Sequence, residues 1–204
     1  SLNIQQQTDR AIVQARSSFW WMAALGDLGP EHPQAFEEAD RLWKGVEANA
    51  DLRKLHVELY AKVLYNKGYT LGAKGLNDEA IECYDQVIAM PDAPAEQRAK
   101  ALNNKGVGLG AKGLNDEAIE CYDQVIAMPD APAEQRAKAL FTSACAYALA
   151  NQLDKMEHSL KLAIQIAPGA RLAAKDDIDF DGVRETPEFR RAVNEPPPTQ
   201  HQTK

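Results

Sequence analysis

Small and apolar residues recur in this chain at spacings of three and four positions, the period of one face of an α-helix. In residues 99–111 they are Leu102, Gly106 and Leu109, and in residues 116–128 they are Ala118, Ile119, Tyr122, Val125 and Ile126. The segment Pro129-Asp130-Ala131-Pro132 follows the second run. Because proline cannot continue the hydrogen-bond ladder of a helix, the pattern predicts two helices and then a loop.

The segment Gly113-Leu114-Asn115-Asp116 separates the two predicted helices. Gly113 is expected to take the left-handed conformation that ends many helices, since glycine has no Cβ. Asn115 or Asp116 is expected to cap the next helix, because a short polar side chain accepts a hydrogen bond from a free amide of the first turn.

This two-helix pattern repeats with a period of 38 residues. Residues 71–102 and 109–140 are identical, and the longer windows 61–98 and 99–136 differ only at Val63/Ala101, Tyr65/Asn103, Tyr69/Val107 and Thr70/Gly108. A third, diverged copy runs from Ala137 to Pro168. Periods of about 20–50 residues are typical of arrays in which neighbouring units bury each other's apolar faces.

The unit resembles the tetratricopeptide repeat (TPR). The family's characteristic small, large apolar, alanine, aromatic and proline positions are matched by Gly106, Leu109, Ala118, Tyr122 and Pro129, with the proline one place early. The loop between units is longer than in the usual repeat of about 34 residues. Over residues 61–168 the resemblance implies an all-α, right-handed superhelical solenoid of antiparallel helix pairs.

We expect one repeat domain over residues 1–194 and a disordered, proline-rich tail over 195–204. The predicted parts of the domain are a diverged N-terminal hairpin over 8–50, with helices at 8–28 and 33–49, repeat units over 51–94, 95–132 and 133–168, and a C-terminal cap over 169–194. Residues 51–74 contain no proline and are expected to form one long helix.

Residues 175–189 resemble the tail that closes many bacterial TPR arrays, a DxDFDxLRxxPxF run in which Val183 here replaces the leucine. The resemblance implies that Phe180 turns inward and that the aspartates face water. Thr186 is expected to cap a helix that starts at Pro187, with Phe189 and Val193 packed. Such a cap is needed because the last repeat otherwise exposes its stacking face.

The same tail also fits a calcium-binding pattern. Asp177, Asp179, Asp181, Gly182 and Glu188 match the D-x-D-x-D-G-x5-E spacing of an EF-hand loop. Arg184 stands where that loop usually has a branched apolar residue, Pro187 stiffens it, and no second hand accompanies it. We therefore expect a cap and no metal site, with a calcium-linked switch as the alternative.

Charge and composition exclude several classes of function. The net charge of -7 and the lack of a Lys/Arg cluster argue against nucleic-acid binding, and no stretch approaches the roughly 18 apolar residues of a membrane span. Three cysteines without framework spacing indicate a reducing compartment, so we expect a cytoplasmic protein. The sequence contains no known catalytic or cofactor-binding signature, so we expect neither an enzyme nor a cofactor.

In TPR arrays the first helix of each unit lines the concave groove, and the resemblance places a peptide-binding surface there. The implied residues are Lys62, Tyr65, Asn66, Tyr69, Lys100, Asn103, Asn104, Val107, Lys138, Phe141 and Cys145. Two of the four differences between the near-identical copies fall in this set. These differences either change what the groove binds, or they arise by chance or by adjustment to the N-terminal hairpin.

The three equivalent lysines are expected to form a cationic ladder that favours an acidic segment with an apolar anchor, or else to be solvated at the edge of the groove. The sequence thus predicts a non-catalytic scaffold that binds a peptide or protein segment. The alternative is a structural, self-associating module or the regulatory arm of a larger protein. It is motivated by Trp20 and Trp21, which as adjacent helical residues cannot share one narrow core stripe.

Overall fold

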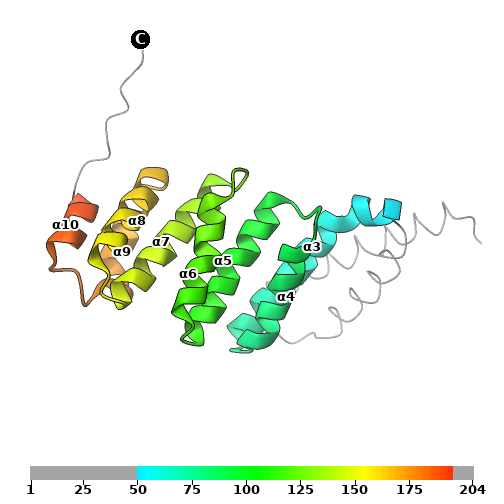
Figure 1. Ribbon diagram of the computed structural model, residues 1–204, viewed down its shortest axis with the longest axis horizontal. Helices are drawn as coiled ribbons and strands as arrows, with labels where there is room; N and C mark the ends of the chain where they lie inside the picture. Colours follow the sequence, from blue (N-terminus) through cyan, green and yellow to red (C-terminus); the bar gives the residue numbers. More distant parts are fainter. Residues whose placement is uncertain (1–49, 195–204) are drawn as a thin grey trace, which may run out of the picture. The chain divides into compact units, whose positions relative to one another are not determined.

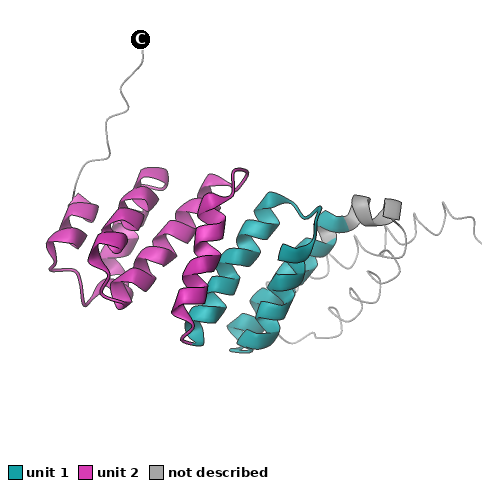
Figure 2. Ribbon diagram, in the orientation of Figure 1, with its two compact units in different colours: residues 1–112 teal, residues 113–204 magenta. Residues whose placement is uncertain are grey.

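A computed structural model describes residues 50–194, and every regular element in this part of the chain is helical (Figure 1). Eight α-helices and one short 3-10 helix follow one another between these limits, as the all-α prediction requires. The chain divides into two compact units, residues 1–112 and 113–204, which are described separately (Figure 2). The predicted hairpin helices at 8–28 and 33–49 and the tail 195–204 lie outside the described residues.

Unit 1 contains α3 (Ala50–Ala73), α4 (Asn77–Ala89) and α5 (Ala95–Ala111). Helix α3 confirms the long helix expected at residues 51–74. Helix α4 packs against both α3 and α5, and α3 also contacts α5. The core between them is built mainly from alanine, aliphatic and tyrosine side chains, including Ala61, Leu64, Ala80, Tyr84, Val87 and Ala101.

A close approach at Gly68 brings α3 against the ring of Tyr84 on α4. A Cβ atom built on Gly68 would lie 2.7 Å from Cε1 of Tyr84, closer than real Cβ contacts. Glycine in the middle of a helix costs about 1 kcal/mol relative to alanine. The close packing of the tyrosine ring explains why position 68 is glycine in spite of this cost.

The turns between paired helices follow the glycine prediction but not the capping prediction. Gly75 and Gly113 have φ values of +77° and +80°, the left-handed conformation expected after a helix. The prediction that Asn115 or Asp116 caps α6 (Asn115–Ala127) was wrong: Leu114 precedes the helix, with no side-chain cap hydrogen bond. A cap must stand before the first helical residue, and the backbone is already helical at Asn115. Asp116 lies in the first turn, where its charge complements the helix dipole.

Unit 2 contains α6, α7 (Ala133–Leu149), α8 (Leu153–Ile166), α9 (Ala170–Asp176), η1 (Ile178–Phe180) and α10 (Pro187–Asn194). Helix α6 ends before Pro129, as predicted. Helix α7 packs against both α6 and α8. The chain then folds back, so that η1 contacts α7 and α10 contacts α8.

Most details expected for the C-terminal segment are present. Phe180, Phe189 and Val193 are buried, and Pro187 is the first residue of α10. The backbone amide of Phe189 donates a 3.3 Å hydrogen bond to Oγ1 of Thr186, which confirms Thr186 as the cap of this helix. Arg191 of α10 forms an ion pair with Glu157 of α8 at 2.7 Å. That this segment closes the array remains a prediction.

Candidate functional site

Unit 1 exposes a surface made by the two helices that were predicted to line the groove. Nδ2 of Asn104 on α5 donates a hydrogen bond to Oη of Tyr65 on α3 at 2.9 Å. Tyr69 and Val107 lie one helical turn beyond these residues on the same two helices, and they are 61% and 49% exposed. We call Tyr65, Tyr69, Asn104 and Val107 together the α3/α5 surface.

Tyr65 and its buried neighbour Tyr84 are neutral groups. Tyr65 lies against Tyr84 with ring centroids 6.2 Å apart. Burial raises the pKa of Tyr65, and the Asn104 hydrogen bond partly offsets this rise. Burial likewise raises the pKa of Tyr84 far above its ordinary value. Neither of these two side chains therefore carries a negative charge at physiological pH.

The lysines predicted to contact a ligand in unit 1 are paired with acids on their own helices. Nζ of Lys62 lies 2.6 Å from Oε1 of Glu58, and Nζ of Lys100 lies 2.6 Å from Oε1 of Glu96. The hydrogen bond and charge of Lys100 lower the pKa of Glu96. In unit 1 the predicted cationic ladder is thus a row of ion pairs. Lys138 is exposed in unit 2, and the full three-lysine ladder remains a prediction.

Burial of the other predicted residues differs along the chain. Asn66 is half-buried, whereas Asn103 is fully buried, so the placement of Asn103 on an open ligand-facing surface was wrong. Asn103 and Asn104 are adjacent, and a helix turns by about 100° per residue. That turn puts Asn103 on the buried side of α5 with Ala99 and Leu102, while Asn104 stays at its edge.

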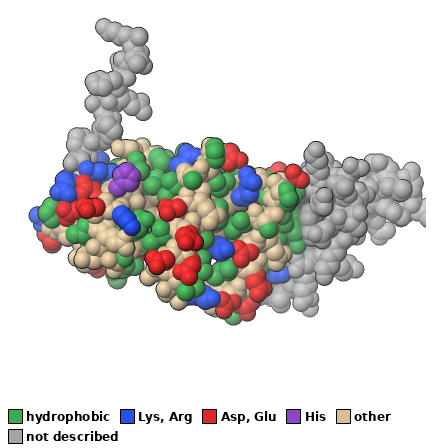
Figure 3. Space-filling model, viewed as in Figure 1, with side chains coloured by type: hydrophobic (Ala, Val, Ile, Leu, Met, Phe, Trp, Pro, Cys, Tyr) green, Lys and Arg blue, Asp and Glu red, His purple; other side chains and the backbone are tan. Residues whose placement is uncertain are grey.

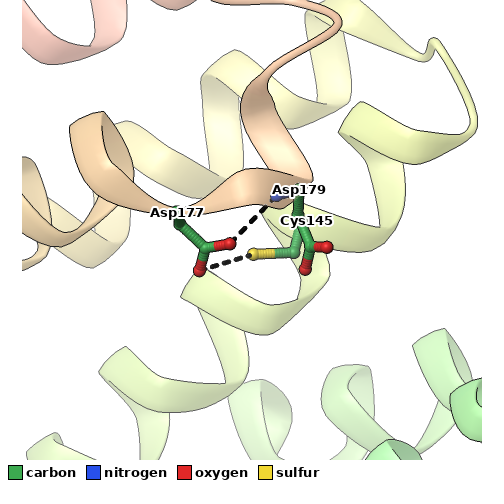
Figure 4. Close-up of side chains that lie close together, drawn as sticks. All are labelled: Cys145, Asp177 and Asp179. Carbon is green, nitrogen blue, oxygen red and sulfur yellow. Dashed lines mark hydrogen bonds between the residues drawn. The ribbon is translucent and has the colours of Figure 1, made fainter.

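In unit 2 two of the equivalent positions, Phe141 and Cys145, contact the chain's own C-terminal segment. Phe141 on α7 packs edge-on against Phe180 with ring centroids 5.8 Å apart, and Phe180 has no exposed surface. Sγ of Cys145 donates to Oδ2 of Asp177 at 4.0 Å (Figure 4). Cys145 is therefore buried beneath η1, and the expectation that it lines an open groove was wrong.

Cys145, Asp177 and Asp179 form a cluster that the sequence did not predict, because Cys145 and Asp177 are 32 residues apart (Figure 4). One potential ligand atom from each lies within 4.8 Å of the others. Burial, and then the charges of the two aspartates, raise the pKa of the Cys145 thiol, so it stays protonated. Metal ions bind the thiolate, and Oδ1 of Asp177 already accepts a 3.0 Å hydrogen bond from the amide of Asp179. We interpret this cluster as packing that holds η1 on α7.

The calcium-like pattern has two of its acids paired with arginines. Asp181 pairs with Arg184 at 2.8 Å, and Glu188 pairs with Arg191 at 3.0 Å. Arg184 also donates to the backbone oxygen of Asp177 at 2.8 Å. The aspartates were expected to face water, which holds for Asp181 but not for the half-buried Asp177 and Asp179.

Two further observations bear on the class of partner. No helix among residues 50–194 has the length and apolar character needed to cross a membrane. Basic side chains are scattered among acidic and hydrophobic ones on the face drawn in Figure 3, and its described part shows no continuous basic surface. Exposed acids on α4 include Asp78, Glu79 and Glu82. This distribution does not favour a nucleic-acid partner.

Comparison with known proteins supports the repeat assignment. The family model described as the tetratricopeptide repeat matches residues 61–93 and 99–131. These ranges are in the register of the 38-residue period, and the diverged third copy lies beyond them. No curated protein matches the chain. The helices at these positions and the family match agree, and residues 61–93 and 99–131 are tetratricopeptide repeats.

Proposed function

We propose that this chain is a non-catalytic interaction module that binds a peptide or protein segment on the α3/α5 surface. The observation that carries the proposal is the exposure of Tyr69 and Val107, which occupy the same repeat position on two helices in contact. Large apolar side chains exposed together on packed helices are typical of surfaces that bind a partner. TPR repeats generally mediate contacts between proteins.

The chemistry of this surface suits a polypeptide partner. Tyrosine has a large ring that buries apolar area on binding and a hydroxyl group that retains a hydrogen bond, so it is common in interfaces. Because Asn104 bonds to Tyr65 and Gly68 allows Tyr84 to pack behind α3, the surface is held by the core of unit 1. A surface that is already ordered loses less conformational entropy on binding.

The difference between the repeats supports the same proposal. The two copies over 61–98 and 99–136 share all but four positions. At one of these four, an exposed position, the first copy has Tyr69 and the second has Val107. This one difference changes an exposed side chain, as adjustment of a binding surface would, whereas the other three change buried or half-buried residues. We place the protein in a reducing compartment such as the cytoplasm, because its three cysteines lack the spacing of a disulfide framework.

A peptide-display selection on the immobilised chain tests the proposal. Peptides selected on the wild type should lose at least about tenfold in affinity for the double variant Tyr69→Ser/Val107→Ser, because an apolar anchor loses its contact. The matched control is Leu76→Ser, which removes an exposed apolar side chain from the α3–α4 turn of the same unit. Circular dichroism checks that each variant is folded.

Two results would count against this function: no peptide is enriched, or the selected peptides bind the double variant as tightly as the wild type. The self-associating alternative rests on Trp20 and Trp21, which lie outside the described residues. Light scattering across a range of protein concentrations tests that alternative separately.

A further inference from the structure

The C-terminal segment shows what chemistry a TPR face of this chain accepts. In unit 2 the segment Asp177-Ile178-Asp179-Phe180 lies on α7 at Phe141 and Cys145. Phe180 supplies a fully buried aromatic anchor, and Asp177 accepts a hydrogen bond from the helix. The segment therefore binds as an acidic stretch with one phenylalanine.

The covered positions in unit 2 have exposed equivalents in unit 1. Cys145 is equivalent to Val107 and Tyr69, and Phe141 is equivalent to Tyr65, each separated by one or two periods of 38 residues. Tyr65 offers an aromatic ring as Phe141 does, and Tyr69 offers a hydroxyl group where Cys145 offers a thiol. The tail buries Cys145. Its equivalents Tyr69 and Val107, in contrast, remain largely exposed.

The charges at the edge of the surface suit the same ligand. Lys62 lies on α3 and Lys100 lies on α5, the two helices that form the surface. Lys62 and Lys100 bond to Glu58 and Glu96, which are exposed acids of their own helices. A carboxylate of a ligand competes with these weak, exposed pairs. We therefore expect the apolar anchor to contribute most of the affinity and the acids to contribute selectivity.

We propose that the α3/α5 surface binds an acidic segment of another protein, of the pattern Asp-x-Asp-Phe, with the phenylalanine against Tyr65, Tyr69 and Val107. This inference rests on the proposed function and names the chemistry of its partner. The occupant is a segment of a different chain, because the chain's own Phe180 is already buried in unit 2.

The probe is a fluorescein-labelled synthetic peptide of residues 175–183, Lys-Asp-Asp-Ile-Asp-Phe-Asp-Gly-Val, titrated with the full chain and followed by fluorescence anisotropy. The same peptide with Phe180→Ala should bind at least about tenfold more weakly, since it lacks the aromatic anchor. A peptide with its aspartates changed to asparagine should bind a few-fold more weakly and with less salt dependence.

The protein variants locate the peptide. The double variant Tyr69→Ser/Val107→Ser should lose binding, whereas Leu149→Ser, which removes an exposed apolar side chain from the last turn of α7 in unit 2, should keep it. Unchanged binding to the double variant overturns the inference, because the peptide then replaces the tail on α7 or binds elsewhere. Equal binding of the Phe180→Ala peptide also overturns it.

Failure of this inference is distinguishable from failure of the proposed function. If the wild-type chain does not bind the Asp-x-Asp-Phe peptide, but display-selected peptides of other chemistry bind and depend on Tyr69 and Val107, only the inference is wrong. If no peptide of any kind depends on these two residues, both are wrong.

Discussion

Asn104 of α5 donates a 2.9 Å hydrogen bond to the hydroxyl oxygen of Tyr65 on α3, which joins two helices that belong to successive repeats. Both residues were predicted to contact a ligand. The bond gives them a structural role as well, because it joins the two helices that carry the exposed Tyr69 and Val107.

We expect Asn104→Ala and Tyr65→Phe each to lower the free energy of unfolding by about 1 kcal/mol, since each removes one partner of the same half-buried hydrogen bond. The double variant should lose less than the sum, because the bond can be lost only once. Urea unfolding of the four proteins measures the coupling. Strictly additive losses would show that the bond does not contribute.

Changing Gly68 or Gly110 to alanine should have opposite effects on stability, because only Gly68 lies against the Tyr84 ring. Gly68→Ala should destabilise the fold by about 1–3 kcal/mol, because its Cβ would lie 2.7 Å from the Tyr84 ring. Gly110→Ala in α5 has no neighbouring atom within 4 Å and should stabilise the fold by up to about 1 kcal/mol through helix propensity. Thermal unfolding of both variants checks the contrast. The packing argument fails if Gly68→Ala also stabilises the protein.

Tyr122 was predicted to be buried in the repeat core, and it is 4% exposed. Tyr122→Ala should cost about 3–5 kcal/mol, as for other buried aromatic residues changed to alanine. Burial raises the pKa of Tyr122 to about 12, with the Thr142 hydrogen bond as a smaller, opposing effect. Tyr122→Phe keeps the buried ring and removes only the hydroxyl group, so it should cost about 1 kcal/mol or less. A loss below about 1 kcal/mol for the alanine variant would contradict the repeat register assigned to this residue.

The ion pair between Glu157 and Arg191 predicts a pH dependence for the packing of α10 on α8. The hydrogen bond from Arg191 is the largest cause of the lowered pKa of Glu157. A lowered folded-state pKa adds stability above the unfolded glutamate pKa of about 4.3, and this stability is lost as the pH falls through the folded-state pKa.

The variant Glu157→Gln should therefore be less stable than the wild type near neutral pH, and the difference should shrink as the solution is acidified. Chemical denaturation at several pH values measures this difference. A constant difference across the range would show that the effect is not caused by the charge of Glu157.

Calcium should not change the melting temperature at millimolar concentration, although the tail matches an EF-hand spacing. Asp181 and Glu188 are paired with Arg184 and Arg191, so two of the acids are already occupied. A ligand that binds only the folded state must raise its stability. A rise with calcium that is absent with magnesium, and is removed by Asp179→Asn, would overturn this prediction.

The sequence by itself determined the helical repeat. The 38-residue period, the left-handed Gly113 and the end of α6 before Pro129 were predictable because periodicity and the effects of glycine and proline on the backbone are local. The cap at Thr186 and the start of a helix at Pro187 were predictable for the same reason.

Only the tertiary structure decided which residues of a helix are covered. Helical spacing gives the direction of a side chain around its own axis, but it does not say what packs against that direction. Asn103 and Asn104 are neighbours in sequence, yet one is buried and the other bonds to Tyr65. Cys145 was assigned to an open groove, and Asp177, 32 residues later, lies over it. Such contacts depend on how distant segments fold together, so the helix pattern could predict a candidate surface but not which of its residues stay exposed.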